Sequence, residues 1–138
     1  MHRSFARNIP SAVILSLCAL TSAAISAPPR AADPAVRGKI LFLRCASCHD
    51  VSAEKSAKIG PNLYGVIGRP AASLEGFAYS PALKAQNFVW DAANLDRWLT
   101  NPNAVAPGTM MTFAGVETAA DRAAIIEYLE RQGPAAVR

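Results

Sequence analysis

The sequence predicts an all-α domain in which a few short helices are joined by long irregular loops. Two observations carry this prediction. Apolar residues recur at helical spacing in several segments, which are bounded by capping residues, glycines and prolines. No segment alternates apolar and polar residues in the way that a half-buried strand does. With 138 residues, 51% of them hydrophobic and 17% charged, the chain has an ordinary composition for one globular domain.

The N-terminus has the pattern of a secretory signal peptide. Arg3 and Arg7 precede the apolar run IPSAVILSLCAL, and the small residues TSAAISA follow it. We therefore expect residues 1–27 to be cleaved and residues 28–138 to form the mature domain, although cleavage after Ala24 also fits the pattern. The alternative is an uncleaved membrane anchor. The run is weakly apolar and interrupted, whereas a spanning helix needs about 20 mostly apolar residues.

The charge of the mature domain does not favour nucleic-acid binding. Two of the 14 basic residues and none of the 10 acidic residues lie within residues 1–27, so the net charge after cleavage is +2. The basic residues form no run or stripe of the kind that binds nucleic acid. Cleavage also removes Cys18 and His2.

The first half of the mature domain contains two predicted helices. Pro34 suits the first turn of a helix that continues through AVRGKILFLRC. Glycine inside a helix costs about 1 kcal/mol relative to alanine, so Gly38 indicates a close packing contact. Residues 50–73 are rich in glycine and proline and are predicted to form a loop. Ser80 caps a short helix, SPALKAQ, with Pro81 at its first position.

Two further helices are predicted in the second half. Asp91 caps a helix that ends at Pro102 and has Leu95, Trp98 and Leu99 on one face. Residues 103–116 are predicted to form a loop. Thr118 caps the last helix, which is expected to end at Gly133 and carries an apolar stripe of Ala124, Ile125, Tyr128 and Leu129. So few helices leave a domain of this size short of core, which suggests that something else fills it.

The stretch Cys45–His49, CASCH, contains all the cysteine and histidine of the mature domain, and it suits three chemistries. A structural zinc site normally needs four protein ligands, so a carboxylate would have to join the two cysteines and the histidine to complete it. A thioredoxin-like redox pair is expected near a βαβ unit, and no strand is predicted. The third chemistry is covalent haem attachment, of which C-x-x-C-H is the signature. Two thiols three positions apart at a helical end can reach both vinyl groups of one porphyrin, and the next residue then presents its imidazole to the iron.

The candidates for the sixth iron ligand are Met110 and Met111, the only methionines after Met1. They lie in PGTMMTF, on a predicted loop. Taken alone, either is more readily explained as a core residue, because methionine commonly fills gaps in cores.

Several segments together resemble those of class I cytochromes c, of the mitochondrial and bacterial c2 type. The resemblance runs from about Pro34 to Arg131, in the family's order and spacing. It includes CASCH, GPNLYGVIGR (60–69), GFAYSPALK (76–84), Trp90, LTNP (99–102), PGTMMTF (107–113) and YL (128–129). It implies the class I cytochrome c fold, with helices and long loops wrapped around one haem c that is bound covalently through Cys45 and Cys48.

The resemblance also implies the axial ligands of the iron. One is His49. The family's Pro-Gly-Thr-x-Met-x-Phe motif places the other at Met111, with Met110 as the fallback. A thioether opposite a histidine raises the reduction potential and leaves no open site on the iron, which argues against peroxide or oxygen chemistry.

Further residues resemble those that support the haem in this family. The carbonyl of Pro61 is expected to accept a hydrogen bond from the ligand histidine, a bond that orients a metal-bound ring. The family's contacts to the haem propionates fall on Arg69, Tyr79, Trp90 and Thr109, and the aromatic that covers the haem falls on Phe113. Gly38 and Phe42 are expected to cross Ile125 and Tyr128. Each of these residues also has an ordinary alternative role in a loop or core.

The sequence departs from the family at several positions. Trp98 stands where many relatives have a tyrosine that bonds the methionine sulfur, and Leu83 replaces a polar residue near a buried water. The lysine ring that docks acidic partners is thin, since Met110, Glu117 and Asp121 lie where relatives are often basic. These departures leave open how the methionine side is tuned and which partners dock.

The function that the resemblance implies is single-electron transfer by a periplasmic, monomeric, monohaem cytochrome that docks transiently with redox proteins at its haem edge. It would be a carrier and not an enzyme, with no nucleic-acid partner and no membrane span in the mature protein. The first alternative is a dedicated haem subunit of one dehydrogenase or oxidase complex. The others are a peroxidase-like enzyme, which needs an open iron site, and a membrane-anchored cytochrome that keeps its N-terminal segment.

Overall fold

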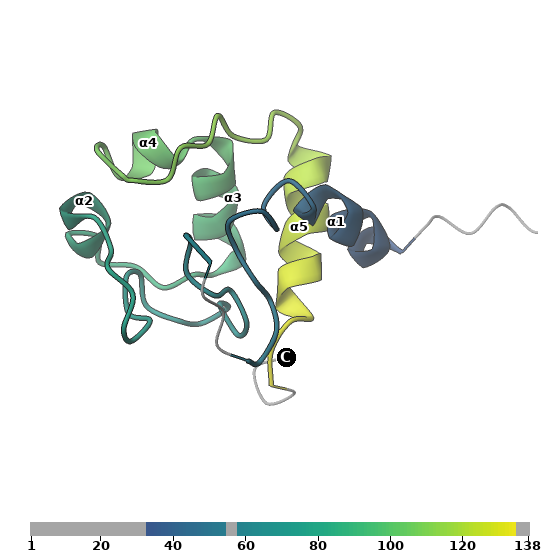
Figure 1. Ribbon diagram of the computed structural model, residues 1–138. Coiled ribbons are helices and arrows are strands. Elements are labelled where there is room, and N and C mark those ends of the chain that lie inside the picture. The colour runs from purple at the N-terminus through teal and green to yellow at the C-terminus, as the bar shows by residue number, and fades with distance from the viewer. Residues whose placement is uncertain (1–32, 55–57, 135–138) are drawn as a thin grey trace, which may run out of the picture. The chain divides into compact units, whose positions relative to one another are not determined.

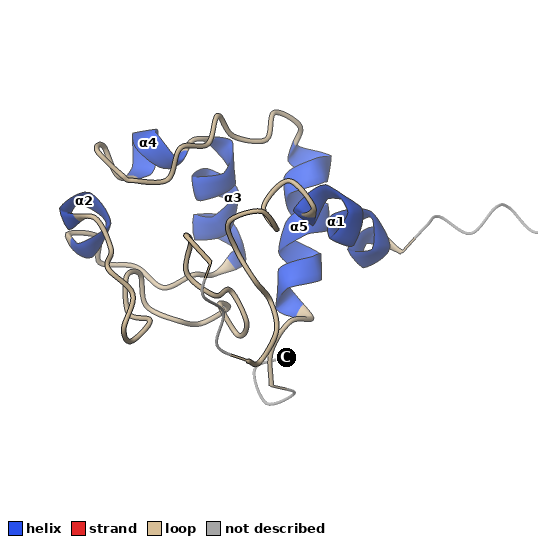
Figure 2. Cartoon of the chain, in the orientation of Figure 1, coloured by secondary structure: helices blue, strands red, loops and turns tan. Residues whose placement is uncertain are grey.

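The computed structural model describes residues 33–54 and 58–134, which belong to one compact unit, Ala31–Arg138. Within these residues the chain forms five helices and no strand, and an isolated antiparallel bridge joins Pro70 and Val89. Long loops connect the helices (Figures 1 and 2). The predicted all-α class with long irregular connections is therefore confirmed.

The predicted signal peptide lies outside the described residues, so the boundary between residues 27 and 28 stays a prediction. In the part of the chain that the structure describes, no helix is long and apolar enough to cross a bilayer.

The first helix, α1 (Pro34–Phe42), begins where the sequence predicts. The carboxylate of Asp33 caps it and accepts a hydrogen bond from the Ala35 N–H at 3.0 Å. Pro34 occupies the first turn, where a helix does not need the N–H that proline lacks. The helix stops at Phe42, and the chain continues in tight turns through residue 48.

The last helix, α5 (Ala119–Glu130), crosses α1 at close range (Figure 1). A Cβ on Gly38 would overlap the carbonyl of Ala124 and the Cβ of Tyr128. The rings of Phe42 and Tyr128 pack with their centroids 5.3 Å apart. The predicted crossing of the first and last helices is confirmed, and it explains the glycine inside α1.

The end of α5 differs from the prediction. Thr118 caps the helix as expected, but the helix ends at Glu130 and not at Gly133. Gly133 instead lies against Gly65, whose Cα would be 3.0 Å from a Cβ on Gly133, and the Gly65 N–H donates to the Gln132 carbonyl at 2.6 Å. The glycine therefore serves a close approach between two loops.

Three short helices lie between these two. Ser80 caps α2 (Pro81–Lys84), and Asp91 caps α3 (Ala92–Thr100), as predicted. The loop predicted after Pro102 is wrong at its start, because a single-turn helix, α4 (Pro102–Val105), begins there with Asn101 as its cap. A proline that cannot continue one helix suits the first turn of the next.

The core lies where α3 and α5 pack together and where loop residues fold onto them. Trp90 links several of its aromatics, with ring centroids 4.9 Å from Phe88 and 5.3 Å from Trp98, both edge-on. The buried cluster consists of Phe42, Val66, Leu83, Trp90, Leu95, Trp98, Leu99, Ala106, Val116, Ile125, Ile126 and Leu129. Cys45, Tyr79, Met111 and Phe113 pack against it from the loops, so the fold brings the predicted site residues to one core.

Candidate functional site

The turn that follows α1 carries the two cysteines and the histidine. The N–H of Cys48 and the N–H of His49 both donate to the Cys45 carbonyl, at 3.0 and 2.8 Å. One helical turn therefore separates Cys45 from His49, which is the local geometry that the C-x-x-C-H spacing predicts. Both thiols are free; Cys45 is half-buried and Cys48 is exposed. Burial raises the pKa of the Cys45 thiol, although the nearby Arg44 opposes this shift.

His49 is buried, with 8% of its surface exposed. Its Nδ1 lies 2.8 Å from the carbonyl oxygen of Pro61, as the resemblance predicts. A carbonyl can only accept, so Nδ1 must carry the proton and Nε2 is left with a free lone pair. Burial lowers the pKa of His49, against the opposing effect of the Pro61 hydrogen bond. The neutral ring that results is the form that ligates a metal.

Gly60 lies close to this imidazole. A Cβ at this position would come within 2.6 Å of Cε1 and 2.8 Å of Nδ1 of His49, and within 2.8 Å of the Cys48 carbonyl oxygen. Its N–H donates to that same carbonyl at 2.8 Å. The glycine thus allows the segment that carries Pro61 to approach the ring closely enough to bond it.

A second group of predicted residues lies on the loop after this segment. The guanidinium of Arg69 donates to the Asn62 carbonyl at 2.9 Å and more weakly to the Tyr64 carbonyl at 3.4 Å. Arg69 is half-buried, and burial lowers its pKa. Burial also raises the pKa of Tyr79, while the charge of Arg69 opposes that rise, so the fold brings these two residues near each other.

Arg69 is a half-buried cation whose hydrogen bonds go to neutral carbonyls. Within residues 33–54 and 58–134, no carboxylate forms an ion pair with it. A buried charge is costly unless it is paired. A haem propionate would supply a carboxylate partner for Arg69. The half-burial of Arg69 without an ion pair among the described residues is therefore the observation that fits the site to a haem.

The methionine loop, residues 106–117, follows α4 and leads to the cap of α5. The Thr109 side chain accepts a hydrogen bond from the Met111 N–H at 3.4 Å. Met111 is partly buried and packs against the core, whereas Met110 is 63% exposed. The structure therefore turns Met111, and not Met110, toward the interior.

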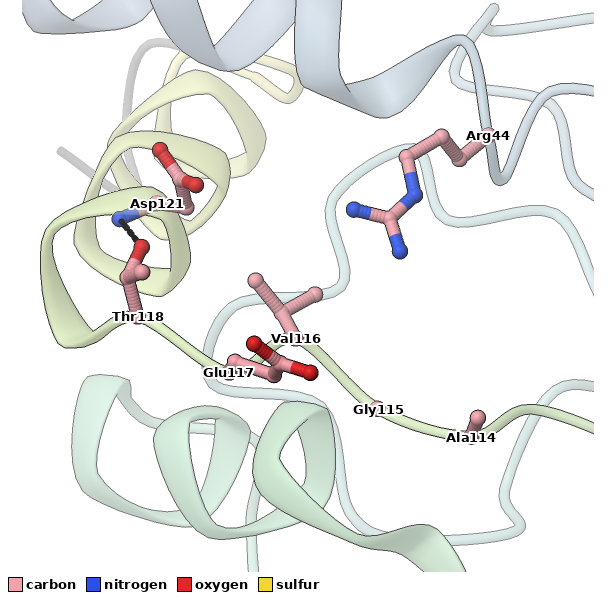
Figure 3. A pocket seen from close by; sticks show the side chains of 7 residues that line it. All are labelled: Arg44, Ala114, Gly115, Val116, Glu117, Thr118 and Asp121. Atoms are coloured by element: carbon pink, nitrogen blue, oxygen red, sulfur yellow. Dashed lines mark hydrogen bonds between the residues drawn. The ribbon is translucent and has the colours of Figure 1, made fainter.

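Arg44, which lies in the turn between α1 and His49, contacts the methionine loop. Its guanidinium carbon lies 6.0 Å from the centroid of the Phe113 ring, at the long limit of a cation–π contact. It also lines a surface pocket of about 320 Å³ whose other wall is the loop leading into α5 (Figure 3). The residues that line this pocket are Arg44, Ala114, Gly115, Val116, Glu117, Thr118 and Asp121.

Comparison with known proteins identifies the family. Residues 35–132 match the family model named Cytochrome c. The chain is 42% identical over 107 residues to the cytochrome c2 of Rhodomicrobium vannielii, which covers 78% of this chain and 86% of that protein. It is 43% identical over 101 residues to the cytochrome c2 of Rhodoblastus acidophilus, which covers 73% and 94%. It is 45% identical over 92 residues to cytochrome c 2.1 of Caenorhabditis briggsae, which covers 67% and 81%. The chain belongs to the cytochrome c family.

Family membership confirms the coarse functional prediction. The protein is an electron carrier of the class I, c2-like type and not an enzyme, its cofactor is covalently bound haem c, and its partners are redox proteins. The family attaches haem through C-x-x-C-H, which is present here as Cys45, Cys48 and His49. The zinc and thioredoxin-like alternatives are therefore set aside.

Two residues of the site were missed by the sequence reasoning. Gly60 is one of several glycines in the predicted loop of residues 50–73, and the signal that could have found it is its position directly before Pro61, the expected partner of the histidine. The sequence assigns Lys58 no role in the site, yet its Nζ donates to the Ala46 carbonyl at 2.7 Å and to the His49 carbonyl at 2.9 Å. No local pattern in the sequence announces a contact of that kind.

Proposed function

We propose that the protein is a periplasmic monohaem cytochrome that passes single electrons between redox proteins. Cys45 and Cys48 hold the haem through thioether bonds, and His49 and Met111 are the axial ligands of its iron. The observation that carries this proposal is the buried imidazole of His49, fixed by the Pro61 carbonyl at 2.8 Å, one residue after two free cysteines.

The bound haem supplies reversible one-electron exchange between ferrous and ferric iron. The protein's part is to keep the ligands in one arrangement in both states. Gly60 and Pro61 hold the His49 ring from one side and fix its tautomer. A ring that does not rotate when the charge changes keeps the reorganisation small.

The choice of Met111 over Met110 rests on burial. Met111 packs against the core, and Met110 is mostly exposed. A methionine opposite the histidine raises the reduction potential and leaves no open position for oxygen or peroxide.

The haem propionates are proposed to lie beside Arg69. Arg69, half-buried and without an ion-pair partner among the described residues, is the principal group that would hold them. Tyr79, Trp90 and Thr109 are proposed as further hydrogen-bond donors. Phe113 is proposed to cover the haem face.

Electron exchange is proposed to occur where the cysteine turn meets solvent. Cys48 and Ser47 are exposed, so a partner can approach the haem edge there. Redox encounters of this kind are small and brief. A monomer suffices for them.

The location is proposed from the N-terminal pattern. Arg3, Arg7 and the apolar run after them predict export and removal of residues 1–27. Intact mass of the protein purified from the periplasm would test this, since a retained segment would leave the full-length mass plus haem.

Visible absorption spectra of the exported protein, oxidised and reduced, test the central proposal. We expect a sharp reduced α band of the c type and a weak far-red band in the oxidised form, which reports iron–methionine ligation. The Met111→Ala variant should lose the far-red band, and the matched Met110→Ala variant should keep it. Absence of haem absorbance despite a working attachment system would overturn the proposal, and the opposite result for the two variants would move the ligand to Met110.

A dedicated haem subunit is the second candidate function, and one observation favours it. Val36 and Ile40 in α1 and Leu43, the residue that caps its end, have helical spacing for one face and are 56%, 64% and 70% exposed. Exposed apolar side chains gathered on one face are typical of a protein interface. Co-purification with a partner that survives high salt and is lost in Ile40→Lys would support this candidate over a diffusing carrier.

A further inference from the structure

Lys58 hydrogen-bonds the Cys45–His49 turn, which carries the haem-attachment motif. Its ammonium donates to the Ala46 carbonyl at 2.7 Å and to the carbonyl of His49 itself at 2.9 Å. Gly60, two residues on, donates its N–H to the Cys48 carbonyl, and Pro61 accepts from the His49 ring. Three of four consecutive residues therefore bond the same turn.

The carbonyls at the end of this turn need such partners. The last carbonyls of a helical segment have no intrahelical donor and carry partial negative charge. A lysine side chain offers three N–H donors on one point charge, which suits carbonyls that lie close together. The two bonds of Lys58 thus hold the end of the turn from which the His49 ring projects.

The ammonium is also a positive charge held at a fixed place beside His49. It lies 2.9 Å from the carbonyl oxygen of this residue. A cation there disfavours any further positive charge on the ring and on the iron that the ring binds. Oxidation of the iron adds one positive charge, so the cation favours the reduced state.

We propose that Lys58 is a positioning residue of the haem site, which clamps the Cys45–His49 turn through two carbonyls and raises the reduction potential through its fixed charge. This inference rests on the proposed ligand role of His49. It differs from a docking role, because the lysine is engaged with its own chain and not held ready for a partner.

The test compares three variants of the haem-loaded, exported protein. Lys58→Met removes the bonds and the charge, and Lys58→Arg keeps the charge and a donor. Lys39→Met is the matched control, since Lys39 is an exposed lysine near the end of α1 for which the described residues show no side-chain hydrogen bond. Potentiometric titration gives the reduction potential, and amide hydrogen exchange reports opening of the turn.

We expect K58M to have a lower potential than the wild type, and K58R to recover most of the difference. K39M should shift the potential much less. The Gly60 and His49 amides should exchange at least several-fold faster in K58M and at the wild-type rate in K39M. If K58M changed the reduction potential but left the amide exchange rates unchanged, Lys58 would act through its charge alone. That result would overturn the positioning role.

Equal potentials in K58M and K39M would overturn the tuning role. Loss of holoprotein in K58M with normal yield of K58R and K39M would support the clamp. A wild-type spectrum without histidine–methionine features would instead overturn the ligand assignment, and the exchange rates would still decide whether Lys58 holds the turn.

Discussion

Replacing Gly60 by alanine tests how the histidine is held. The new Cβ would lie 2.6 Å from Cε1 of His49 and 2.8 Å from the Cys48 carbonyl oxygen, closer than any ordinary contact. That carbonyl is pinned by the Gly60 N–H, and the ring is pinned by Pro61, so neither can yield without losing a hydrogen bond. A substitution that crowds the chain in this way should push the imidazole out of its position.

Two opposing effects set the magnitude. Gly60 does not adopt a positive φ, so alanine would gain about 0.4–1 kcal/mol by restricting the unfolded chain. Overpacking costs about 1–3 kcal/mol, and the clash here is with backbone and a fixed ring. We expect G60A to be destabilised by about 1–2 kcal/mol in total. With a slope of about 3 kcal/mol per M, the guanidinium chloride midpoint would fall by roughly 0.3–0.7 M.

The assay follows unfolding of the holoprotein in guanidinium chloride and the visible spectrum in the native state. Gly76→Ala is the matched control, because a Cβ there meets nothing within 4 Å but the residue has φ +77°. That backbone strain costs about 1–2 kcal/mol, so stability should fall in both variants. The reduction potential and spectrum should change in G60A alone. A G60A protein as stable as the wild type, or one with an unchanged potential, would refute the reasoning.

Three further outcomes follow from the same contacts. Gly38→Ala should destabilise the protein by about 1–3 kcal/mol, because its Cβ meets the Ala124 backbone; an unchanged thermal midpoint would contradict this. Arg69→Met should lower the reduction potential and make it more dependent on pH as a propionate loses its partner, while Arg69→Lys should restore part of the loss; potentials measured from pH 5 to 8 decide. Arg131 hydrogen-bonds Asp33 and holds the pKa of that carboxyl below its usual value, so the stability advantage of the wild type over Asp33→Asn should be full at neutral pH and shrink as the pH falls below about 4. An advantage that grew with acidity would contradict the ion pair.

The parts of the fold that were predicted from sequence are those decided locally. Ser80, Asp91 and Thr118 each cap a helix because a side-chain oxygen reaches an N–H three residues on, and that relation is visible in the sequence. The missed helix after Pro102 was decided just as locally. Its cap, Asn101, and its proline carry the same signal as Ser80 and Pro81, but the same proline also stops the preceding helix, and this hides the start of the next one.

The parts that were not predicted depend on segments far apart in the chain. Gly133 follows a helical pattern and so was expected to end it, but a contact with Gly65 decides its role. The bonds from Lys58 to the cysteine turn require a chain reversal whose shape no pattern specifies. The C-x-x-C-H motif located the site because its chemistry is confined to five neighbouring residues, and the shell around it had to come from the resemblance or the structure.

The crossing of α1 and α5 also decides how late in folding the turn after α1 becomes ordered. Arg37 bonds Asp121 across 84 residues of chain and Arg131 bonds Asp33 across 98, so α1 is made first and its partner last. A nine-residue helix is marginal in water without its partner. The turn that carries Cys45 and Cys48 therefore remains unsupported until the two ends of the chain have met. That interval keeps both thiols open to covalent attachment before the last helix closes over the first.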